Sequence, residues 1–294
     1  MAPFTPIPLD SAETIACYSP TPNDTAVQIE KAQVEHRIQL INTWRIPPGS
    51  KILEIGCGQG TCTTVLATAV GPNGHVDAVD PAPSDYGSPY TLSQAQAIIS
   101  AGALGSRITW HNDEPTDVLA TSGEKVWDYA VFSHCIWYFD SRDVLSTILR
   151  AIKGRVGSIL VAEYALRATE RDAEPHVLSA LARASLEAHN PASTANIRCL
   201  LSPAGIKDVA EASGWKAGDE FNIVPAAGLL DGVWETDEVR SKSFVEEVEK
   251  RINSPRVKET LLSSREAVIA SCTDLDGRKT RTMDVWATSF TLAE

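Results

Sequence analysis

The sequence KILEIGCGQG, at residues 51–60, decides the fold of this chain. Its apolar residues are typical of a buried strand, and the alternate glycines Gly56, Gly58 and Gly60 predict a tight turn with a bare backbone. A second strand-like run, HVDAVD, ends at Asp80, twenty residues after Gly60. This spacing predicts a strand, a turn, a helix and a second strand that ends on a carboxylate. We therefore expect a site for a cofactor that carries a nucleoside.

The composition and the charge limit the classes of partner. The chain has 294 residues, of which 43% are hydrophobic and 22% charged, and its net charge is −12. A negative protein is disfavoured as a nucleic-acid binder, because phosphate binding requires a basic face. No basic residue precedes Lys31, so no signal peptide is expected, and no apolar run approaches the ~20 residues that span a bilayer. We expect a cytoplasmic protein with a small-molecule substrate and no membrane partner.

A proline-rich segment precedes the first predicted helix. Residues 1–24 contain five prolines and are expected to be an irregular segment in front of one domain at residues 25–294. Apolar residues recur at helical spacing over 25–44 and predict one helix. Pro47-Pro48-Gly49 ends this helix and leads into the first strand.

Strands and helices then alternate along the chain. The predicted strands cover 51–55, 75–80, about 107–111, 129–133 and 158–164. The predicted helices run from Thr61 to Val70, from a capping box at Thr91 to Gly102, and from a cap at Asp140 to Lys153. This alternation predicts an α/β fold with a doubly wound, mostly parallel sheet that helices cover on both faces.

The pattern changes after the fifth predicted strand. Residues 167–200 form a long helical stretch, which we expect to be a lid-like insertion. The remaining predicted elements are a helix that begins at Ser202-Pro203, a strand at 215–225, helices at 235–252 and from Pro255, and a strand at 280–292.

The glycine turn differs from the turn of dinucleotide-binding proteins. Those turns read G-x-G-x-x-G, in which the third glycine lets the helix pack close and the helix N-terminus faces a pyrophosphate. Here the pattern is G-x-G-x-G, and Thr61 stands where the third glycine would be needed. S-adenosylmethionine (SAM) has no phosphate, so the turn of a SAM site passes under an amino-acid moiety and an adenosine instead. The turn favours SAM, with a dinucleotide oxidoreductase as an alternative class.

The stretches KILEIGCGQG and HVDAVDPAP, with the order of elements from about residue 35 to 292, resemble the class I SAM-dependent methyltransferases. The resemblance implies the Rossmann-like seven-stranded sheet of that family, in which strand seven is inserted antiparallel between strands five and six. It also implies SAM as the cofactor.

The resemblance assigns cofactor contacts residue by residue. Gly56, Gly58 and Gly60 match the turn whose backbone lies against the methionyl end of SAM. Glu54 matches the acidic residue that helps to fix the SAM amino group or the loop. Asp80 matches the carboxylate that accepts hydrogen bonds from both ribose hydroxyls. The alternative for Glu54 and Asp80 is that each only caps a loop.

Two further strand ends supply candidates for the cofactor site. Asn112 or Asp113, just after the third strand, would lie where members of the family bind the adenine amino group. Ser133 and His134 end the fourth strand and would face the cofactor pocket. The alternative for Asn112 and Asp113 is a role in the loop alone.

His134 is the leading candidate for a catalytic base. Methyl transfer requires orientation and a nucleophile in the right protonation state. A thiol, with a pKa of about 8.5, needs little help, whereas a hydroxyl usually needs a base or a metal. His134 lies at the carboxyl end of the predicted sheet, where ligands bind in open α/β folds. The alternative is a packing histidine beside the cofactor.

Several aromatic residues are candidates for substrate contacts. One of Trp137, Tyr138 and Phe139 is expected to face the substrate, and we choose Trp137, with core packing as the alternative. Tyr18 could fold over the cofactor, and His176 could face the substrate from the lid-like helix. The alternatives are a surface aromatic for Tyr18 and a solvated helix position for His176. We expect no metal site, because no set of His and carboxylate residues has a ligand spacing.

The sequence predicts a small-molecule methyltransferase. The acidic surface, the lid-like insertion and the aromatic site are similar to those of fungal secondary-metabolite methyltransferases, including the gliotoxin-type enzymes that S-methylate dithiols. Thiol S-methylation is therefore the leading hypothesis for the acceptor. The alternatives are O- or N-methylation of a small metabolite, and an enzyme of the same fold that binds SAM without transferring its methyl group.

Overall fold

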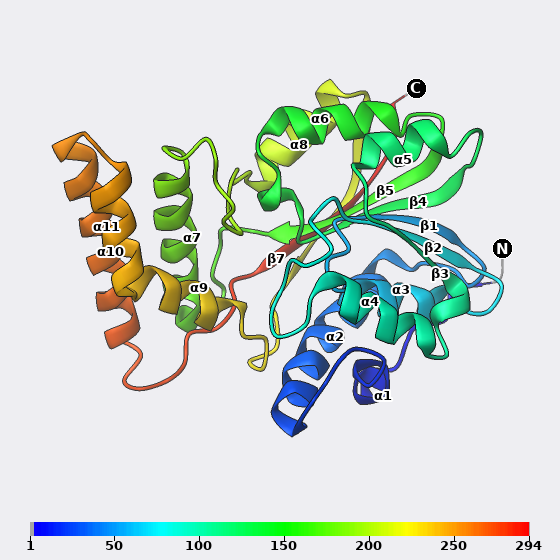
Figure 1. The fold of residues 1–294 in the computed structure, drawn as a ribbon, viewed down its shortest axis with the longest axis horizontal. Coiled ribbons are helices and arrows are strands. Elements are labelled where there is room, and N and C mark those ends of the chain that lie inside the picture. The colour runs from blue at the N-terminus through cyan, green and yellow to red at the C-terminus, as the bar shows by residue number, and fades with distance from the viewer. Residues whose placement is uncertain (1–2, 294) are drawn as a thin grey trace.

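A seven-stranded sheet forms the centre of the computed structural model, which describes residues 3–293 (Figure 1). The strands run in the spatial order β3-β2-β1-β4-β5-β7-β6. Strand β7 is antiparallel to both of its neighbours, and the other observed pairs are parallel. The strands are β1 Lys51–Ile55, β2 His75–Val79, β3 Ile108–His111, β4 Trp127–Ser133, β5 Val156–Tyr164, β6 Trp215–Ile223 and β7 Val285–Leu292. The predicted sheet, with strand seven between five and six, is confirmed.

Helices cover both faces of this sheet, as Figure 1 shows. On one face lie α1 Ala12–Ala16, α2 Asp24–Trp44, α3 Thr61–Val70 and α4 Leu92–Ala101; on the other lie α5 Pro115–Thr121, α6 Arg142–Ala151 and α8 Pro203–Ala212. Successive strand residues face opposite layers: Ile52 packs with the first set of helices, and Leu53 packs with the second. This explains why the strand sequences are apolar at nearly every position.

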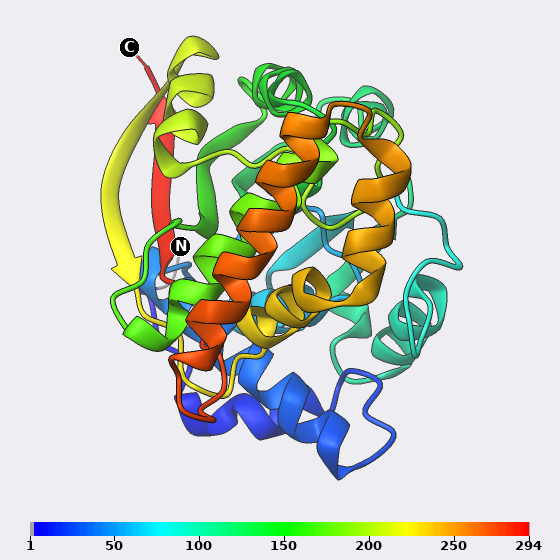
Figure 2. The same cartoon turned by 90° about the vertical axis from the view of Figure 1, so that its left-hand side faces the viewer.

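Four further helices, which we call the helical cap, pack beyond the end of the sheet where β5 ends and β7 begins (Figure 1). They are α7 Glu174–Glu187, α9 Asp231–Arg240, α10 Lys242–Arg251 and α11 Pro255–Thr273. Figure 2 looks onto this side and shows α7 in green beside α11 in orange. The cap has an apolar core of its own, which includes Leu186, Val239 and Phe244. Since strand carboxyl ends meet the cap here, a ligand site is expected between them.

Four element predictions need correction. Within the segment predicted to be irregular, residues 12–16 form α1, in the stretch that the prolines leave free. Ser141, not Asp140, caps α6, and its hydroxyl accepts a hydrogen bond from the Asp143 N–H. The predicted helix at 235–252 is two helices, because Ser241 adopts an extended backbone and caps α10. Helix α7 covers only part of 167–200, so the role of this segment as a lid stays a prediction.

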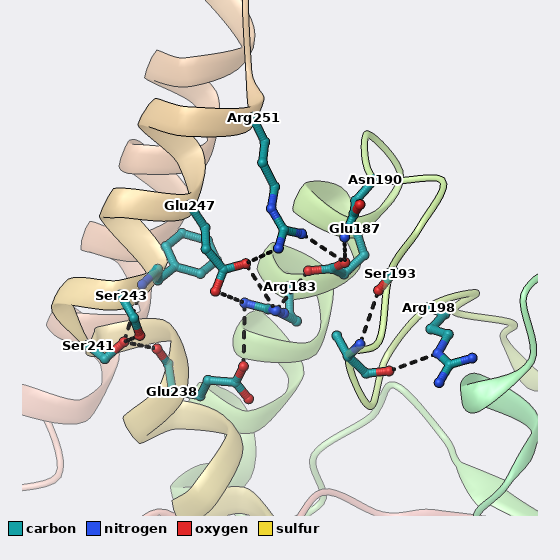
Figure 3. A network of polar contacts seen from close by, with 12 residues as sticks. Arg183, Glu187, Asn190, Ser193, Arg198, Glu238, Ser241, Ser243, Glu247 and Arg251 are labelled. Carbon is teal, nitrogen blue, oxygen red and sulfur yellow. Dashed lines mark hydrogen bonds and ion pairs between the residues drawn. The ribbon is translucent and has the colours of Figure 1, made fainter. Parts of the chain in front are cut away.

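A buried ion-pair network joins three helices of the cap (Figure 3). Arg183 of α7 is 6% exposed and pairs with Glu187 (2.8 Å), Glu247 of α10 (3.3 Å) and Glu238 of α9 (3.4 Å). Arg251 reaches Glu187 as well, at 3.6 Å. Arg183 therefore links α7 to both α9 and α10, and Arg251 adds a second ion pair between α10 and α7.

A second buried contact fixes the turn after β1. Glu54 is 1% exposed, and its Oε2 accepts a hydrogen bond from the Thr63 hydroxyl of α3 (2.6 Å). Burial raises the pKa of Glu54 to about 7, although the bond from Thr63 lowers it in part. The contact ties the strand before the glycine turn to the helix after it.

We expect the Arg183→Met variant to lose about 3 kcal/mol of unfolding free energy, because the Glu187 carboxylate then stays buried with weaker partners. The double variant Arg183→Met/Glu187→Leu should regain most of this loss, since the buried Glu187 charge is removed, Glu247 keeps Arg251 as its partner and the half-exposed Glu238 is solvated. The exposed pair of Arg278 offers the control, and Arg278→Met should cost less than 1 kcal/mol. Urea unfolding measures all three; a double variant as unstable as the single one would contradict a charge-based effect.

The Glu54→Gln variant tests the second contact through pH. A carboxyl whose folded pKa lies above its unfolded value of 4.5 stabilises the fold at low pH, and this stability is lost as pH rises toward 7. Relative to Glu54→Gln, the natural chain should therefore lose on the order of 3 kcal/mol between pH 4.5 and pH 8. Denaturant titrations at several pH values give the comparison, and parallel curves for the two proteins would refute the expectation.

Candidate functional site

The three glycines of the turn have different physical roles. All have positive φ, at 75° for Gly56, 54° for Gly58 and 101° for Gly60, which favours glycine. A Cβ on Gly56 would lie 2.4 Å from the Cys135 Cβ, and one on Gly60 would lie 2.8 Å from side-chain atoms of Ile99 and Trp110. A Cβ on Gly58 would meet nothing within 4 Å. Gly58 therefore leaves space above the turn, which is where a ligand can approach the backbone.

Asp80 holds this turn from the end of β2. Its Oδ2 accepts a hydrogen bond from the Gly58 N–H (2.7 Å), and its Oδ1 accepts one from the Ala82 N–H (3.0 Å). Each oxygen keeps lone-pair capacity, so the carboxylate can still accept two hydroxyl hydrogens. Asp80 thus shapes a loop and fits a ribose at the same time.

Asn112 and Asp113 lie beside this carboxylate. The Asn112 Nδ2 donates to the backbone oxygens of Asp80 (2.9 Å) and Ala82 (2.6 Å), and Asp113 is exposed. Asn112 therefore braces the turn after β2. Contact of either residue with an adenine stays a prediction.

His134 follows β4, next to the glycine turn. Its φ of 55° is unusual for a residue other than glycine, and such backbone strain is concentrated at functional sites. Its side chain is 6% exposed, and its Nδ1 lies 3.6 Å from Oε1 of the buried Glu163. Burial lowers the pKa of His134, and the nearby Glu163 carboxylate opposes this in part. The ring is therefore neutral near pH 7 and can accept a proton. The preceding Ser133 hydroxyl lies buried beside the Cys62 thiol.

Four rings meet at this strand end, and we call them the histidine cluster: His36, His134, Tyr164 and His176. The His134 ring lies 5.1 Å from that of His36 and 4.6 Å from that of Tyr164, between centroids. The Tyr164 ring contacts His176 edge-on at 5.1 Å. Burial lowers the pKa of His176 to about 4, so this ring is neutral as well. The cluster joins α2, β4, β5 and α7.

Carboxylates of α9 lie next to the histidine cluster. Asp231 accepts a hydrogen bond from the Gln33 Nε2 of α2 (3.0 Å), and after burial its charge is a further cause that raises the pKa of Tyr164. Burial raises the pKa of Glu235 to about 7. Burial also raises the pKa of Tyr138 well above its ordinary value, and the charge of Glu235 raises it further. Tyr138 is nevertheless 42% exposed, so it borders the site at the protein surface.

The structure brings most of the predicted residues together and places Tyr18 apart from them. Trp137 is 3% exposed, packs against Tyr164 of the histidine cluster and donates its Nε1–H to the Leu201 oxygen (2.9 Å), whereas Tyr138 is accessible. Contact of Trp137 with the substrate stays a prediction. Tyr18 packs in the apolar layer of α1 to α4, near Gly102 at the far end of α4, away from the histidine cluster.

Sequence reasoning missed His36, Gln33, Glu163, Tyr164 and Asp231. Their partners are distant in sequence, by 98 residues for His36 and 198 for Gln33. The signals that could have indicated them were a polar residue on the helix before β1 and polar residues at the carboxyl end of β5.

Over residues 3–293, no three His, Cys, Asp or Glu side chains converge in a way that could hold a metal ion. Within the same residues, no helix has the length and apolar character that crossing a membrane requires.

Known proteins share both the sequence pattern and the fold. A model of the methyltransferase domain family matches residues 28–217. The methyltransferase phomM′ of Diaporthe leptostromiformis is 29% identical over 283 residues, which cover 82% of this chain and 73% of that protein. A cyclopropane-fatty-acyl-phospholipid synthase-like protein from Lactobacillus casei is 30% identical, with a TM-score of 0.83 over 96% of this chain and 99% of the other. The [4+2]-cyclase SpnF, 12% identical with a TM-score of 0.50 over 96% of this chain and 91% of its own, shares only the fold.

The family match agrees with the geometry of the turn. Its open space at Gly58 and the remaining capacity of Asp80 fit an adenosyl group with free ribose hydroxyls. The chain belongs to the methyltransferase domain family and is a SAM-dependent methyltransferase with the class I fold.

Proposed function

We propose that this enzyme methylates a heteroatom of a small metabolite beside the histidine cluster, with His134 as the general base. The observation that carries the proposal is the position of His134. It follows β4, the strand next to β1, so the neutral ring stands beside the glycine turn with the Glu163 carboxylate behind it.

The residues that would hold SAM are those of the turn and of the neighbouring strand ends. The backbone of Gly56 to Gly60 would lie against the methionyl part, Asp80 would accept from the ribose, and Asn112 or Asp113 would contact the adenine. When bound, SAM supplies a methyl group on a cationic sulfur; a bond from that carbon to the acceptor forms as the carbon–sulfur bond breaks, and S-adenosylhomocysteine is left. Glu54 and Ser133 lie below this site, where Glu54 fixes the turn through Thr63.

Residues of this chain take up the proton that the acceptor loses. The His134 Nε2 takes it as the new bond forms, and the Glu163 carboxylate stabilises the charge that the ring then carries. Glu163 is held for this role by the backbone N–H groups of Ile136 and Tyr164, each at 3.1 Å. Release of this proton to water returns the ring to its neutral form.

A thiol of a secondary metabolite remains the proposed acceptor. The resemblance to fungal S-methyltransferases supports it. Hydroxyl and amine acceptors are the alternatives, and the base at His134 serves all three. The cytoplasmic location is part of the same proposal.

Substitution of Asp80 by Ala should weaken the binding of S-adenosylhomocysteine roughly 10- to 100-fold, because two hydrogen bonds to a charged acceptor are lost. Isothermal titration calorimetry measures this affinity. Asp117→Ala, at an exposed position of α5, is the control and should bind as the natural chain does. Equal affinities for the two variants would remove Asp80 from the cofactor site.

The His134→Asn variant tests the base, since Asn tolerates a positive φ and cannot take the proton. We expect kcat to fall 10²- to 10⁴-fold for a hydroxyl or amine acceptor, with unchanged affinity for S-adenosylhomocysteine. The assay incubates methyl-labelled SAM with a panel of thiols, phenols, amines and an unsaturated phospholipid. If only thiols are labelled and His134→Asn labels them at the natural rate, the general-base role is wrong and self-ionisation of the thiol is sufficient.

A further inference from the structure

The contact between His36 and His134 is a direct one between ring nitrogens. The Nε2 of His36 lies 2.9 Å from the Nε2 of His134, and His36 is 3% exposed. Two nitrogens at this distance form a hydrogen bond only when one of them carries a hydrogen. Burial lowers the pKa of His36 well below its ordinary value, with the neighbouring His134 and Arg37 adding to this. His36 is therefore neutral, and one of its nitrogens carries the only ring hydrogen.

The neighbouring carboxylate decides which ring donates. Glu163 faces the His134 Nδ1, and a carboxylate in that place favours a hydrogen on Nδ1. The His134 Nε2 is then bare, so the hydrogen between the two rings belongs to His36. The base nitrogen of the proposed reaction is thus already in a hydrogen bond in the enzyme without its acceptor.

Helix α2 is fixed at three points along the face that carries His36. Glu30 accepts from the Thr61 hydroxyl at the start of α3 (2.8 Å), and Gln33 donates to Asp231 of the cap (3.0 Å). His36 contacts His134 one turn further on. The helix therefore connects the glycine turn, the cap and the base, and this places the His36 ring against His134 before the acceptor binds.

We propose that His36 is a positioning residue for methyl transfer: its Nε2–H holds the His134 ring with a bare Nε2, and the hydrogen of the acceptor replaces it there. The inference rests on the proposed function. In the step itself, the covalent bond between the acceptor atom and its hydrogen breaks, and the hydrogen passes as a proton to the His134 Nε2. The electron pair of the acceptor atom would bond to the methyl carbon as the carbon–sulfur bond of SAM breaks, which leaves S-adenosylhomocysteine. His134 leaves the step as an imidazolium beside Glu163.

The charged and titratable groups around His134 come from four elements. They are Glu163 and Tyr164 of β5, His36 and Arg37 of α2, Asp231 of α9 and His176 of α7. Among the described residues, His36 is the hydrogen-bond partner of the His134 Nε2. The proposed role can therefore be removed without changing the contact of the base with Glu163, whose Oε1 lies 3.6 Å from the His134 Nδ1.

A hydrogen-bond measurement tests the resting enzyme without any acceptor. In the full-length protein with ¹⁵N-labelled histidine, NMR should detect a ¹⁵N–¹⁵N coupling between the two Nε2 atoms, and the hydrogen should be bonded to His36. Assignment uses the single variants of each histidine. Absence of the coupling, or a hydrogen on the His134 Nε2, would overturn the proposal whether or not the enzyme methylates the expected acceptor class.

Two variants of similar shape give the kinetic test. His36→Gln keeps an N–H donor, whereas His36→Met fills the space without one. With the acceptor found in the labelling panel, kcat should fall at least 10-fold for His36→Met and stay within about 3-fold for His36→Gln, while S-adenosylhomocysteine binds both equally. Equal kcat values for the two variants, or an effect on KM alone, would show that the ring of His36 serves packing or acceptor binding instead.

Discussion

The hydrogen bond from the Gly58 N–H to Asp80 is the contact on which the cofactor half of the enzyme depends. It joins the turn after β1 to the end of β2 at 2.7 Å, and so converts two loops into one surface. Below it, the Glu54–Thr63 contact fixes the same turn to α3. Because a loop with positive φ at three positions has many alternative conformations, these two carboxylates select the one that leaves the backbone accessible.

The reactive half depends on contacts between distant segments. Helix α2 precedes the sheet in the sequence, and the cap helices come from the segments after β5 and after β6. Helix α2 and the cap helices α7 and α9 reach the end of β4, where the histidine cluster lies beside Glu163 and Asp231. The strained backbone of His134 is maintained by this surrounding structure, which is typical of functional positions.

The parts of the fold that depend on local signals were predictable. The glycine turn, the capping box at Thr91 and the Ser202-Pro203 helix start all act over a few residues, and the structure contains each of them. The partners of His134 were not predictable, since no local pattern relates His36 to a residue 98 positions away. The exposure of Tyr138 and the burial of Trp137 were not predictable for another reason: both lie in one short 3-10 turn, Ile136–Tyr138, whose rotation cannot be derived from three residues.

The separate apolar core of the helical cap has a consequence for how such an enzyme diversifies. Leu186, Val239 and Phe244 pack against other cap residues, whereas the strands pack with the layers on either face of the sheet. Mutations can therefore change the packing of the cap while the sheet and the glycine turn, which bind the adenosyl group, keep their stability. A lineage that inherits this architecture can explore new metabolites through one part of its chain and retain an unchanged methyl donor through the other.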